Sequence, residues 1–144
     1  MHKIFKRNGQ ADLFVFLGDG EEELLKLKDF YIDKKILWVC GNCDSCSMTK
    51  NLKTEILPDG EKMLYTHGNK LNVRSGTDKL LEVAKTENAR IALFGHTHCR
   101  YAQERDGVLL LNPGSAGAPR DGLPASYAWI DVLENGLVYN HVNL

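Results

Sequence analysis

Four short apolar segments, each joined directly to a glycine and a side chain able to bind a metal ion, constrain this chain most. Their β-branched and aromatic residues predict strands over Leu13–Leu17, Ile36–Cys40, Lys62–Thr66 and Ile91–Phe94. They lead into Gly18-Asp19, Gly41-Asn42, His67-Gly68 and Gly95-His96-Thr97-His98. Ligands bind outside the carboxyl ends of strands in sheets of this kind. Five side chains are therefore expected to meet at one rim of one sheet: Asp19, Asn42, His67, His96 and His98.

The remaining pattern predicts two helices and three hairpins. Apolar spacing favours helices over Glu21–Tyr31 and Thr77–Thr86. Asp59-Gly60, Asp106-Gly107 and Asn135-Gly136 each separate two strand-like runs, as hairpin turns do. Few helices and many strands indicate an α/β (α+β) chain with two packed sheets flanked by helices. No repeat or linker composition interrupts it, so residues 1–144 are expected to form a single domain.

Composition excludes several classes of function. The formal net charge of -1 provides no long-range field that would gather nucleic acid or anionic lipid. No apolar run approaches the roughly 20 residues that cross a bilayer. The four cysteines without a secretory signal favour a reducing compartment, so a cytoplasmic location is expected.

The chemistry of the five side chains points to a transition metal. Imidazole suits Mn, Fe, Ni or Zn, and carboxylate or amide oxygens suit the harder members of that set. His96 and His98 are two residues apart, so both rings would point to the same side of an extended backbone. Asp19 has two oxygens and could bridge two ions, and such a pair can hold a hydroxide for in-line attack on a phosphoryl group. The alternative is that these residues are helix caps and turn residues.

The series Gly18-Asp19, Gly41-Asn42-Cys43-Asp44, Thr66-His67-Gly68 and Gly95-His96-Thr97-His98 resembles the calcineurin-like metallophosphoesterases. Together with Asn112-Pro113-Gly114-Ser115 and Pro119-Arg120, it looks most similar to their small bacterial and archaeal phosphodiesterase branch. The resemblance implies a two-sheet β-sandwich flanked by helices. It also implies hydrolysis of a small phosphodiester or phosphate ester with two divalent ions, Mn before Ni, Fe or Zn. Asp19 would bridge the ions, Asn42, His67 and His96 would complete the second site, and His98 would belong to the first.

The family's opening motif, Asp-x-His at the end of a first strand, has no counterpart in this sequence. The first metal site is therefore expected to be incomplete, and the sheet to lack a strand beside Leu13–Leu17. Activity would then be impaired, and the open edge would favour a homo-oligomer. A late start, a fragment and a variant that has given up one metal are the three explanations.

Cysteines and the missing general acid give further alternatives. Cys43 stands where larger relatives place a histidine that protonates the leaving group, which favours substrates with good leaving groups. Cys40, Cys43 and Cys46 form a C-x2-C-x2-C run that could bind zinc or an iron–sulfur cluster, but the fourth ligand at the usual spacing is missing. The simpler interpretation has Cys40 buried, Cys43 near the metal rim and Cys46 in a loop.

Three hypotheses follow: a phosphodiesterase, a non-catalytic protein-binding scaffold on the same fold, and a small cysteine-based metal or redox protein. The scaffold has a precedent, because a subunit of the retromer coat resembles this branch. Arg74, Arg100 and Arg120 are candidates to meet a substrate phosphate or are surface charges, and His141 is expected at the surface. The aromatic residues Tyr101, Trp129 and Tyr139 indicate sheet packing rather than a platform for nucleic-acid bases.

Overall fold

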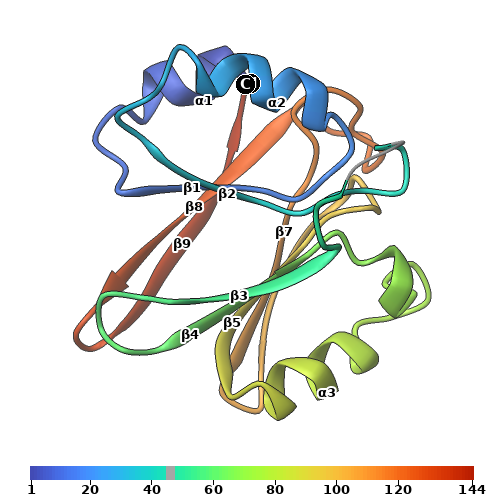
Figure 1. Cartoon of the computed structure of the whole chain (residues 1–144). Helices are drawn as coiled ribbons and strands as arrows, with labels where there is room; N and C mark the ends of the chain where they lie inside the picture. Colours follow the sequence, from blue (N-terminus) through green and yellow to red (C-terminus); the bar gives the residue numbers. More distant parts are fainter. Residues whose placement is uncertain (45–47) are drawn as a thin grey trace.

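The computed structural model describes residues 1–44 and 48–144 (Figure 1). Its helical elements are α1 (His2–Arg7), α2 (Glu21–Lys28), the 3-10 helix η1 (Asn69–Leu71) and α3 (Asp78–Thr86). Its strands are β1 (Leu13–Phe16), β2 (Lys35–Trp38), β3 (Leu52–Ile56), β4 (Lys62–Thr66), β5 (Ala89–Phe94), β6 (Arg100–Arg105), β7 (Val108–Pro113), β8 (Ser126–Leu133) and β9 (Gly136–Asn143).

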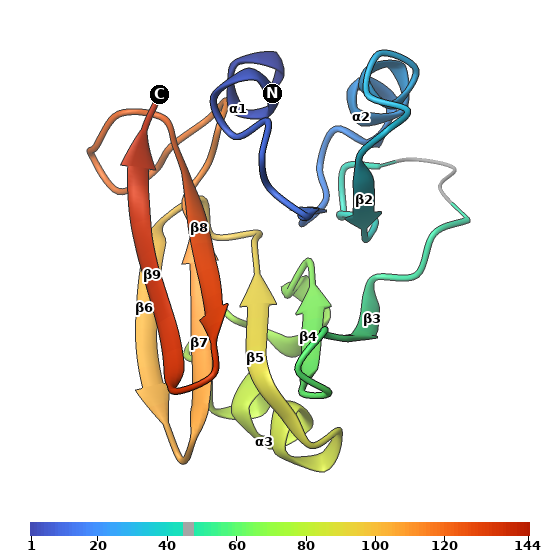
Figure 2. The ribbon, with the colours of Figure 1, turned by 90° about the vertical axis from the view of Figure 1, so that its left-hand side faces the viewer.

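A five-stranded mixed sheet in the order β3-β4-β5-β7-β6 forms the centre of the structure. β4, β5 and β7 run parallel, and β3 and β6 are antiparallel strands at its edges. Two further sheets have two strands each, the parallel pair β1-β2 and the antiparallel pair β8-β9. In Figure 2 the strands of the five-stranded sheet lie side by side, with the β8-β9 hairpin in front of β6 and β7 and with α1 and α2 at the top of the view.

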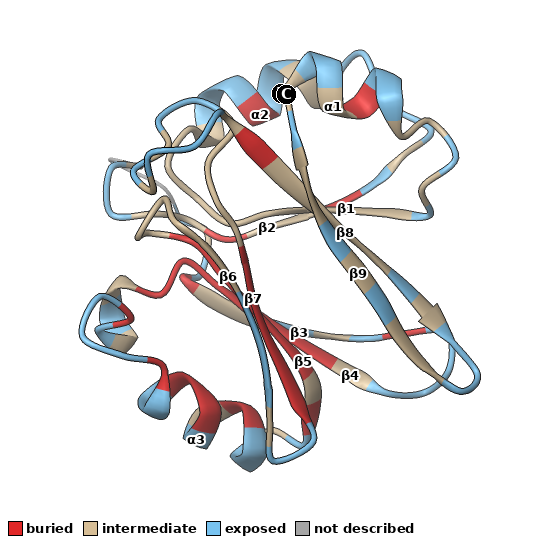
Figure 3. Cartoon of the chain, turned by 180° about the vertical axis from the view of Figure 1, so that it is seen from behind, coloured by how far each residue is buried: buried red, intermediate tan, exposed pale blue. Residues whose placement is uncertain are grey.

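The central strands bury both of their faces, and alternate residues serve different cores. Leu110 of β7 packs with α3, whereas its neighbours Leu109 and Leu111 pack with residues of β1, β2, β8 and β9. Such a strand shows a continuous apolar run because neither face meets water. Figure 3 shows this burial concentrated in β4, β5, β7 and the inner side of α3.

The layers follow from these cores. The helix α3 covers one face of the five-stranded sheet. Both two-stranded sheets cover the other face. A third core, built around Phe5, Leu24 and Ile36, joins α1 and α2 to the outer face of β1-β2. The expected sandwich flanked by helices is confirmed, with one correction: its second layer consists of two separate small sheets in the described part of the chain.

The local predictions are mostly confirmed. The three hairpins form where their turn dipeptides predict, and both Asp106 and Gly107 have positive φ, as a tight two-residue turn requires. The predicted helix over Glu21–Tyr31 is too long, since α2 ends at Lys28. Tyr31 instead stacks on Phe5 of α1, with ring centroids 4.6 Å apart.

The described helices are all too short or too polar to cross a membrane. The two chain ends lie close together, because Arg7 at the end of α1 donates a hydrogen bond of 3.1 Å to the carbonyl oxygen of Asn143 in β9. The open edge of β1 can be located from the pairing, since β2 is its hydrogen-bonded partner and none is found on its other side among the described residues. Homo-oligomer formation through this edge stays a prediction.

Candidate metal centre

The five sequence-predicted site residues lie on loops that follow the carboxyl ends of four strands. Asp19 follows β1, Asn42 follows β2, His67 follows β4, and His96 and His98 follow β5. The expectation of one rim on one sheet is wrong, because β1-β2 and β4-β5 belong to different sheets. Since both pairs are parallel and pack against the same core, their carboxyl ends still meet at one place between the two layers.

His67 is the centre of this place. Its side chain is 1% exposed. Its Nδ1 lies 2.7 Å from the carbonyl oxygen of Leu17 and must donate to it, because a carbonyl oxygen carries no hydrogen. In a neutral imidazole the other nitrogen, Nε2, then has a free lone pair. That nitrogen faces Asn42 Oδ1 at 3.0 Å, His96 Nδ1 at 3.2 Å and Asp19 Oδ2 at 3.5 Å.

These contacts bring lone pairs together without enough hydrogens between them. Asn42 Oδ1 and Asp19 Oδ2 are acceptors, and so is His67 Nε2 in this tautomer. Two ligand atoms that are each ~2.1 Å from one ion lie roughly 3.0–3.4 Å apart, which is close to the separations found here. This donor set suits a divalent cation, with Asp19, Asn42, His67 and His96 as the side chains that would hold it.

His98 reaches Asp19 from the other side. Its Nδ1 donates to the carbonyl oxygen of Ala118 at 2.7 Å, which leaves Nε2 with a lone pair 3.9 Å from Asp19 Oδ2. Asp19 therefore lies between His67 and His98, as a bridging carboxylate would. Around His98 the described residues bring together two side chains, Asp19 and His98, against four around His67. No group of three or more His, Cys, Asp or Glu side chains among the described residues, the group around His67 included, is already spaced to hold an ion.

The reason given for the common direction of His96 and His98 is wrong. β5 ends at Phe94, and both histidines have left-handed backbone, with φ of 63° and 59°. They approach the same carboxylate because the loop turns sharply, and not because it is extended. Asn112 stabilises that turn: its amide donates to the Gly95 carbonyl at 2.8 Å and to Thr97 Oγ1 at 3.1 Å.

The charge state of His96 suits a ligand. Partial burial, followed by the electrostatic influence of His67 and Arg74, lowers the pKa of His96 below its ordinary value. The imidazole is therefore neutral near pH 7, where the unperturbed pKa is about 6.5. A neutral ring is the form that binds metal ions.

Two glycines allow the loops to approach closely. A side chain on Gly41 would collide with the Asp19 carboxylate and backbone nitrogen, and one on Gly18 would collide with the backbone of Gly41 and the His67 ring. Gly18 also has a φ of 94°, which glycine adopts without strain. The Gly-Asp and Gly-Asn pairs of the sequence thus have a steric cause.

Among the described residues, Cys40, Cys43 and Cys99 are free thiols outside any metal-binding cluster, and the cysteine alternative stays a prediction because its run includes Cys46. The negative charge of Asp19 raises the pKa of Cys43, so its thiol stays protonated at neutral pH. Cys40 is half-buried, and not buried as expected. Cys46 lies outside the described residues.

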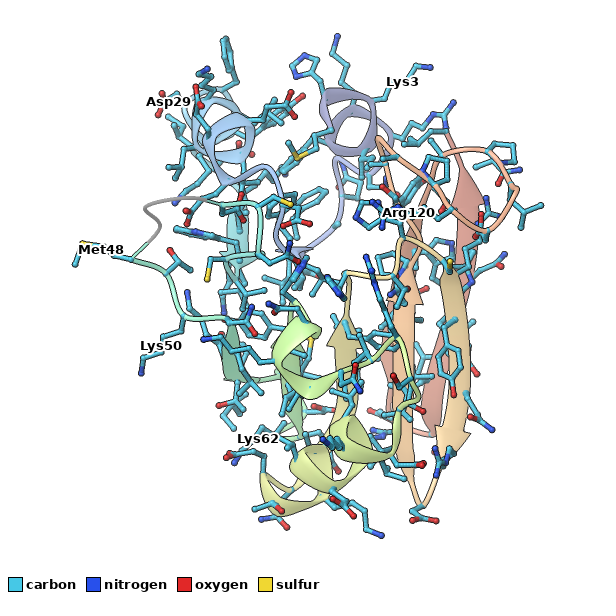
Figure 4. The ribbon with its side chains drawn as sticks, turned by 90° about the vertical axis from the view of Figure 1, so that its right-hand side faces the viewer. Lys3, Asp29, Met48, Lys50, Lys62 and Arg120 are labelled. Atoms are coloured by element: carbon cyan, nitrogen blue, oxygen red, sulfur yellow. The ribbon has the colours of Figure 1, made fainter. Side chains whose placement is uncertain are left out.

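The remaining candidates divide into structural and exposed side chains. Arg100 is structural, because its guanidinium donates to the Pro124 carbonyl at 2.6 Å and pairs with Asp121. His141 is also structural, with Nε2 2.7 Å from the carbonyl oxygen of Asn112, which corrects the expected surface position. Arg74 and Arg120 are exposed. Figure 4 labels Arg120 on the loop between β7 and β8, toward the opposite end of the molecule from Lys62 at the start of β4.

Sequence reasoning gave no role to Asn112 and Asp44. Asn112 holds the loop of His96 and His98, and the carboxylate of Asp44 accepts hydrogen bonds from the loop of Asp19. Both residues belong to sequence motifs that the family resemblance includes, Asn112-Pro113-Gly114-Ser115 and Gly41-Asn42-Cys43-Asp44. Membership of these motifs is the sequence signal that could have indicated their roles.

Comparison with known proteins identifies the family of the chain. A model of the calcineurin-like phosphoesterase superfamily domain matches residues 1–135. The probable metallophosphoesterase YsnB of Bacillus subtilis is 31% identical over 140 residues, 94% of this chain and 77% of YsnB. The phosphodiesterase YfcE of Escherichia coli is 30% identical over 104 residues, 67% of this chain and 53% of YfcE. The match thus spans about half the length of YfcE.

Solved structures share the fold. A predicted phosphoesterase from Streptococcus pneumoniae superposes with a TM-score of 0.77 at 23% identity, over 91% of this chain and 88% of that one. A Vps29 mutant from Entamoeba histolytica superposes with a TM-score of 0.75 at 18% identity, over 100% of this chain and 89% of that one.

The chain belongs to the calcineurin-like phosphoesterase superfamily. Its relatives place it in the small bacterial and archaeal branch, whose members are named metallophosphoesterases and phosphodiesterases. Divalent metal ions are the cofactors that such a family implies.

Proposed function

We propose that this protein hydrolyses phosphate esters, phosphodiesters foremost, with two divalent ions of which Mn²⁺ is the first candidate. The observation that carries the proposal is the arrangement around His67. Its Nδ1 is committed to the Leu17 carbonyl, so the Nε2 lone pair is directed at the oxygen atoms of Asn42 and Asp19. These acceptors face one another around the buried His67 side chain, and a bound cation would compensate their lone pairs.

The candidate ligands would have two roles, binding one ion on each side of Asp19 and bridging the two ions through Asp19. His67, His96 and Asn42 would hold one ion, Asp19 would be shared, and His98 would hold the other. When bound, the pair of ions supplies Lewis acidity and an activated water for in-line attack on phosphorus. The backbone carbonyls of Leu17 and Ala118 fix the ring orientations of His67 and His98, as outer partners of metal-binding histidines do.

Leaving-group chemistry narrows the substrates. The thiol of Cys43 lies beside Asp19, and its raised pKa makes it a poor proton donor to a departing oxygen. Efficient general acids have a pKa near the working pH. Esters whose alcohol leaves easily as an anion are therefore the expected substrates, with bis(4-nitrophenyl) phosphate as a practical probe.

The test is hydrolysis of that diester by the metal-stripped chain, with Mn²⁺ added back. We expect Mn²⁺-dependent release of 4-nitrophenol, its loss in His67→Gln, and its retention in His2→Gln. His2 is the matched control, because it is an exposed histidine on α1. A wild-type chain that is inert toward this diester at saturating Mn²⁺ contradicts the proposal.

The second candidate function is a protein-binding scaffold, favoured by exposed apolar side chains between α2 and β2. Phe30 is 76% exposed and Ile32 is 88% exposed. Vps29, a vacuolar protein sorting protein by its name, shares the fold. As a scaffold, the wild-type chain would leave the diester intact with Mn²⁺. The double variant Phe30→Ser/Ile32→Ser would then lower any association seen by sedimentation velocity.

A further inference from the structure

The carboxylate of Asp44 accepts hydrogen bonds from four backbone N–H groups. The donors are Asp19 at 2.8 Å, Gly20 at 2.7 Å, Glu21 at 3.0 Å and Gly41 at 2.7 Å. Two carboxylate oxygens offer about four lone-pair positions, and these four donors occupy them. Asp44 therefore has no lone pair left for a metal ion or a substrate, although it lies two residues from Asn42.

Two of the four donors, Asp19 and Gly20, belong to a loop of unusual conformation, and a third, Glu21, is the first residue of α2 directly after it. Gly18, Asp19 and Gly20 have φ of 94°, 60° and 126°, all in the left-handed region. For Asp19 this conformation costs free energy, because a side chain there crowds the backbone. Successive N–H groups in such a loop can point to one side and form a nest for an anion. Here the anion that fills the nest is the chain's own Asp44.

The contact is reciprocal. Asp44 binds the loop that follows β1, and Asp19 Oδ1 in that loop accepts a hydrogen bond of 2.9 Å from the backbone nitrogen of Cys43, in the loop that follows β2. The two loops are therefore joined by hydrogen bonds to two carboxylates, one from each loop, and each carboxylate accepts backbone N–H groups of the other loop. The second oxygen of Asp19, Oδ2, is then directed to His67 and His98.

The same hydrogen bonds also fix the position of Asn42. It stands between Gly41, which donates to Asp44, and Cys43, which donates to Asp19. Its own amide nitrogen lies 3.4 Å from Cys43 Sγ, so Oδ1 is the atom that faces His67. The direction of both oxygen ligands therefore depends on loops that the Asp44 carboxylate holds.

We propose that Asp44 is the positioning residue of this site: by filling the backbone nest at Asp19–Glu21 and holding Gly41, its carboxylate directs Asp19 Oδ2 and Asn42 Oδ1 toward His67. The metal-binding part of this role rests on the proposed function. The backbone part stands on the hydrogen bonds alone.

The test compares wild type with Asp44→Asn and Asp44→Ala in Mn²⁺ affinity, measured from the electron paramagnetic resonance of free Mn²⁺. Asn keeps one acceptor oxygen and Ala keeps none. Loss of outer partners weakens metal affinity about 10–100-fold. We therefore expect Asp44→Asn to bind Mn²⁺ about 10–100-fold more weakly than wild type, and Asp44→Ala to bind it more weakly still. The matched control is Asp59→Asn, whose carboxylate accepts the backbone N–H of Glu61 at 3.1 Å in the β3–β4 hairpin. It should bind within about twofold of wild type.

Amide hydrogen exchange separates positioning from a general loss of structure. In Asp44→Asn the amides of Asp19, Gly20 and Gly41 should exchange faster, while amides of β5 and β7 keep wild-type protection. An Asp44→Asn protein with wild-type Mn²⁺ affinity overturns the proposal. So does a fall in affinity that comes with equal loss of protection in β5 and β7.

If neither variant folds, amide hydrogen exchange of the wild-type protein tests the proposal. The amides of Asp19, Gly20 and Gly41 should then be protected like strand amides, and free exchange there overturns the proposal. A wild type that binds no Mn²⁺ contradicts the proposed function instead, and this exchange measurement still decides the backbone role of Asp44.

Discussion

The two halves of the site share Asp19 but differ in what surrounds it. Around His67, atoms of three other side chains from both layers lie 3.0–3.5 Å from its Nε2. His98 Nε2 faces one of these side chains, Asp19, whose Oδ2 is 3.9 Å away. Metal affinity depends on the number of preformed ligands, so the difference predicts one strong and one weak ion. Two motifs of the same type, a histidine fixed through Nδ1 by a carbonyl, can thus differ in strength through their neighbours.

Loss of His67 should have the largest effect. His67→Gln removes the atom on which the stronger half is centred, and we expect Mn²⁺-dependent diester hydrolysis to fall by at least about 100-fold, since outer-partner losses alone cost 10–100-fold. Steady-state kinetics at saturating Mn²⁺ measures this. Hydrolysis within tenfold of the wild-type rate would contradict the claim that the half around His67 is the stronger metal site.

Metal titration tests the inequality directly. After chelation and dialysis, calorimetric titration with Mn²⁺ should show two binding events per chain whose affinities differ by at least about tenfold, or ~1.4 kcal/mol. Elemental analysis at low free Mn²⁺ should then find one ion per chain. Two equally tight ions would mean that groups other than Asp19 and His98 complete the weaker half.

The variant His98→Gln should act on the weaker half alone. We expect hydrolysis to fall by about tenfold, with the tighter Mn²⁺ event kept within about threefold, because His98 contacts Asp19 and none of the three other ligands of the stronger half in the described structure. The same calorimetric titration measures both events. Weakening of the tighter event by the same factor as the second would show that the halves bind as one unit.

The smallest expected effect is a loss of stability at low pH, caused by Asp121 in the loop between β7 and β8 that also contacts His98. Asp121 accepts the backbone N–H of Arg100 at 3.0 Å, and this bond lowers the pKa of its carboxyl group. The stabilisation is complete above the unfolded pKa of about 3.9 and is lost as pH falls through the lower folded value. Thermal unfolding between about pH 5 and pH 2.5 should therefore show a steeper loss in wild type than in Asp121→Asn. Parallel curves would contradict it.

The sequence predicted local features well and the site's second layer poorly. Turn dipeptides such as Asp106-Gly107 act through their own backbone, so the hairpins could be predicted from adjacent residues. The assignment of β1-β2 to a sheet of its own depends on contacts distant in sequence, as does the early end of α2, where Tyr31 packs on Phe5. The five site residues could be named because each follows a strand. The role of the Asp44 carboxylate could not be predicted, since three of its four partners lie more than 20 residues away.

The position of the site between two layers has a consequence for stability. Asp19 and Asn42 come from the β1-β2 sheet, while His67 and His96 come from the five-stranded sheet, and no strand pairing joins these sheets in the described residues. A bound ion would act as a cross-link between them. By thermodynamic linkage, an ion at 100 times its dissociation constant stabilises the folded state by about 2.7 kcal/mol. The availability of the metal would therefore set the lifetime of this protein as well as its rate of hydrolysis.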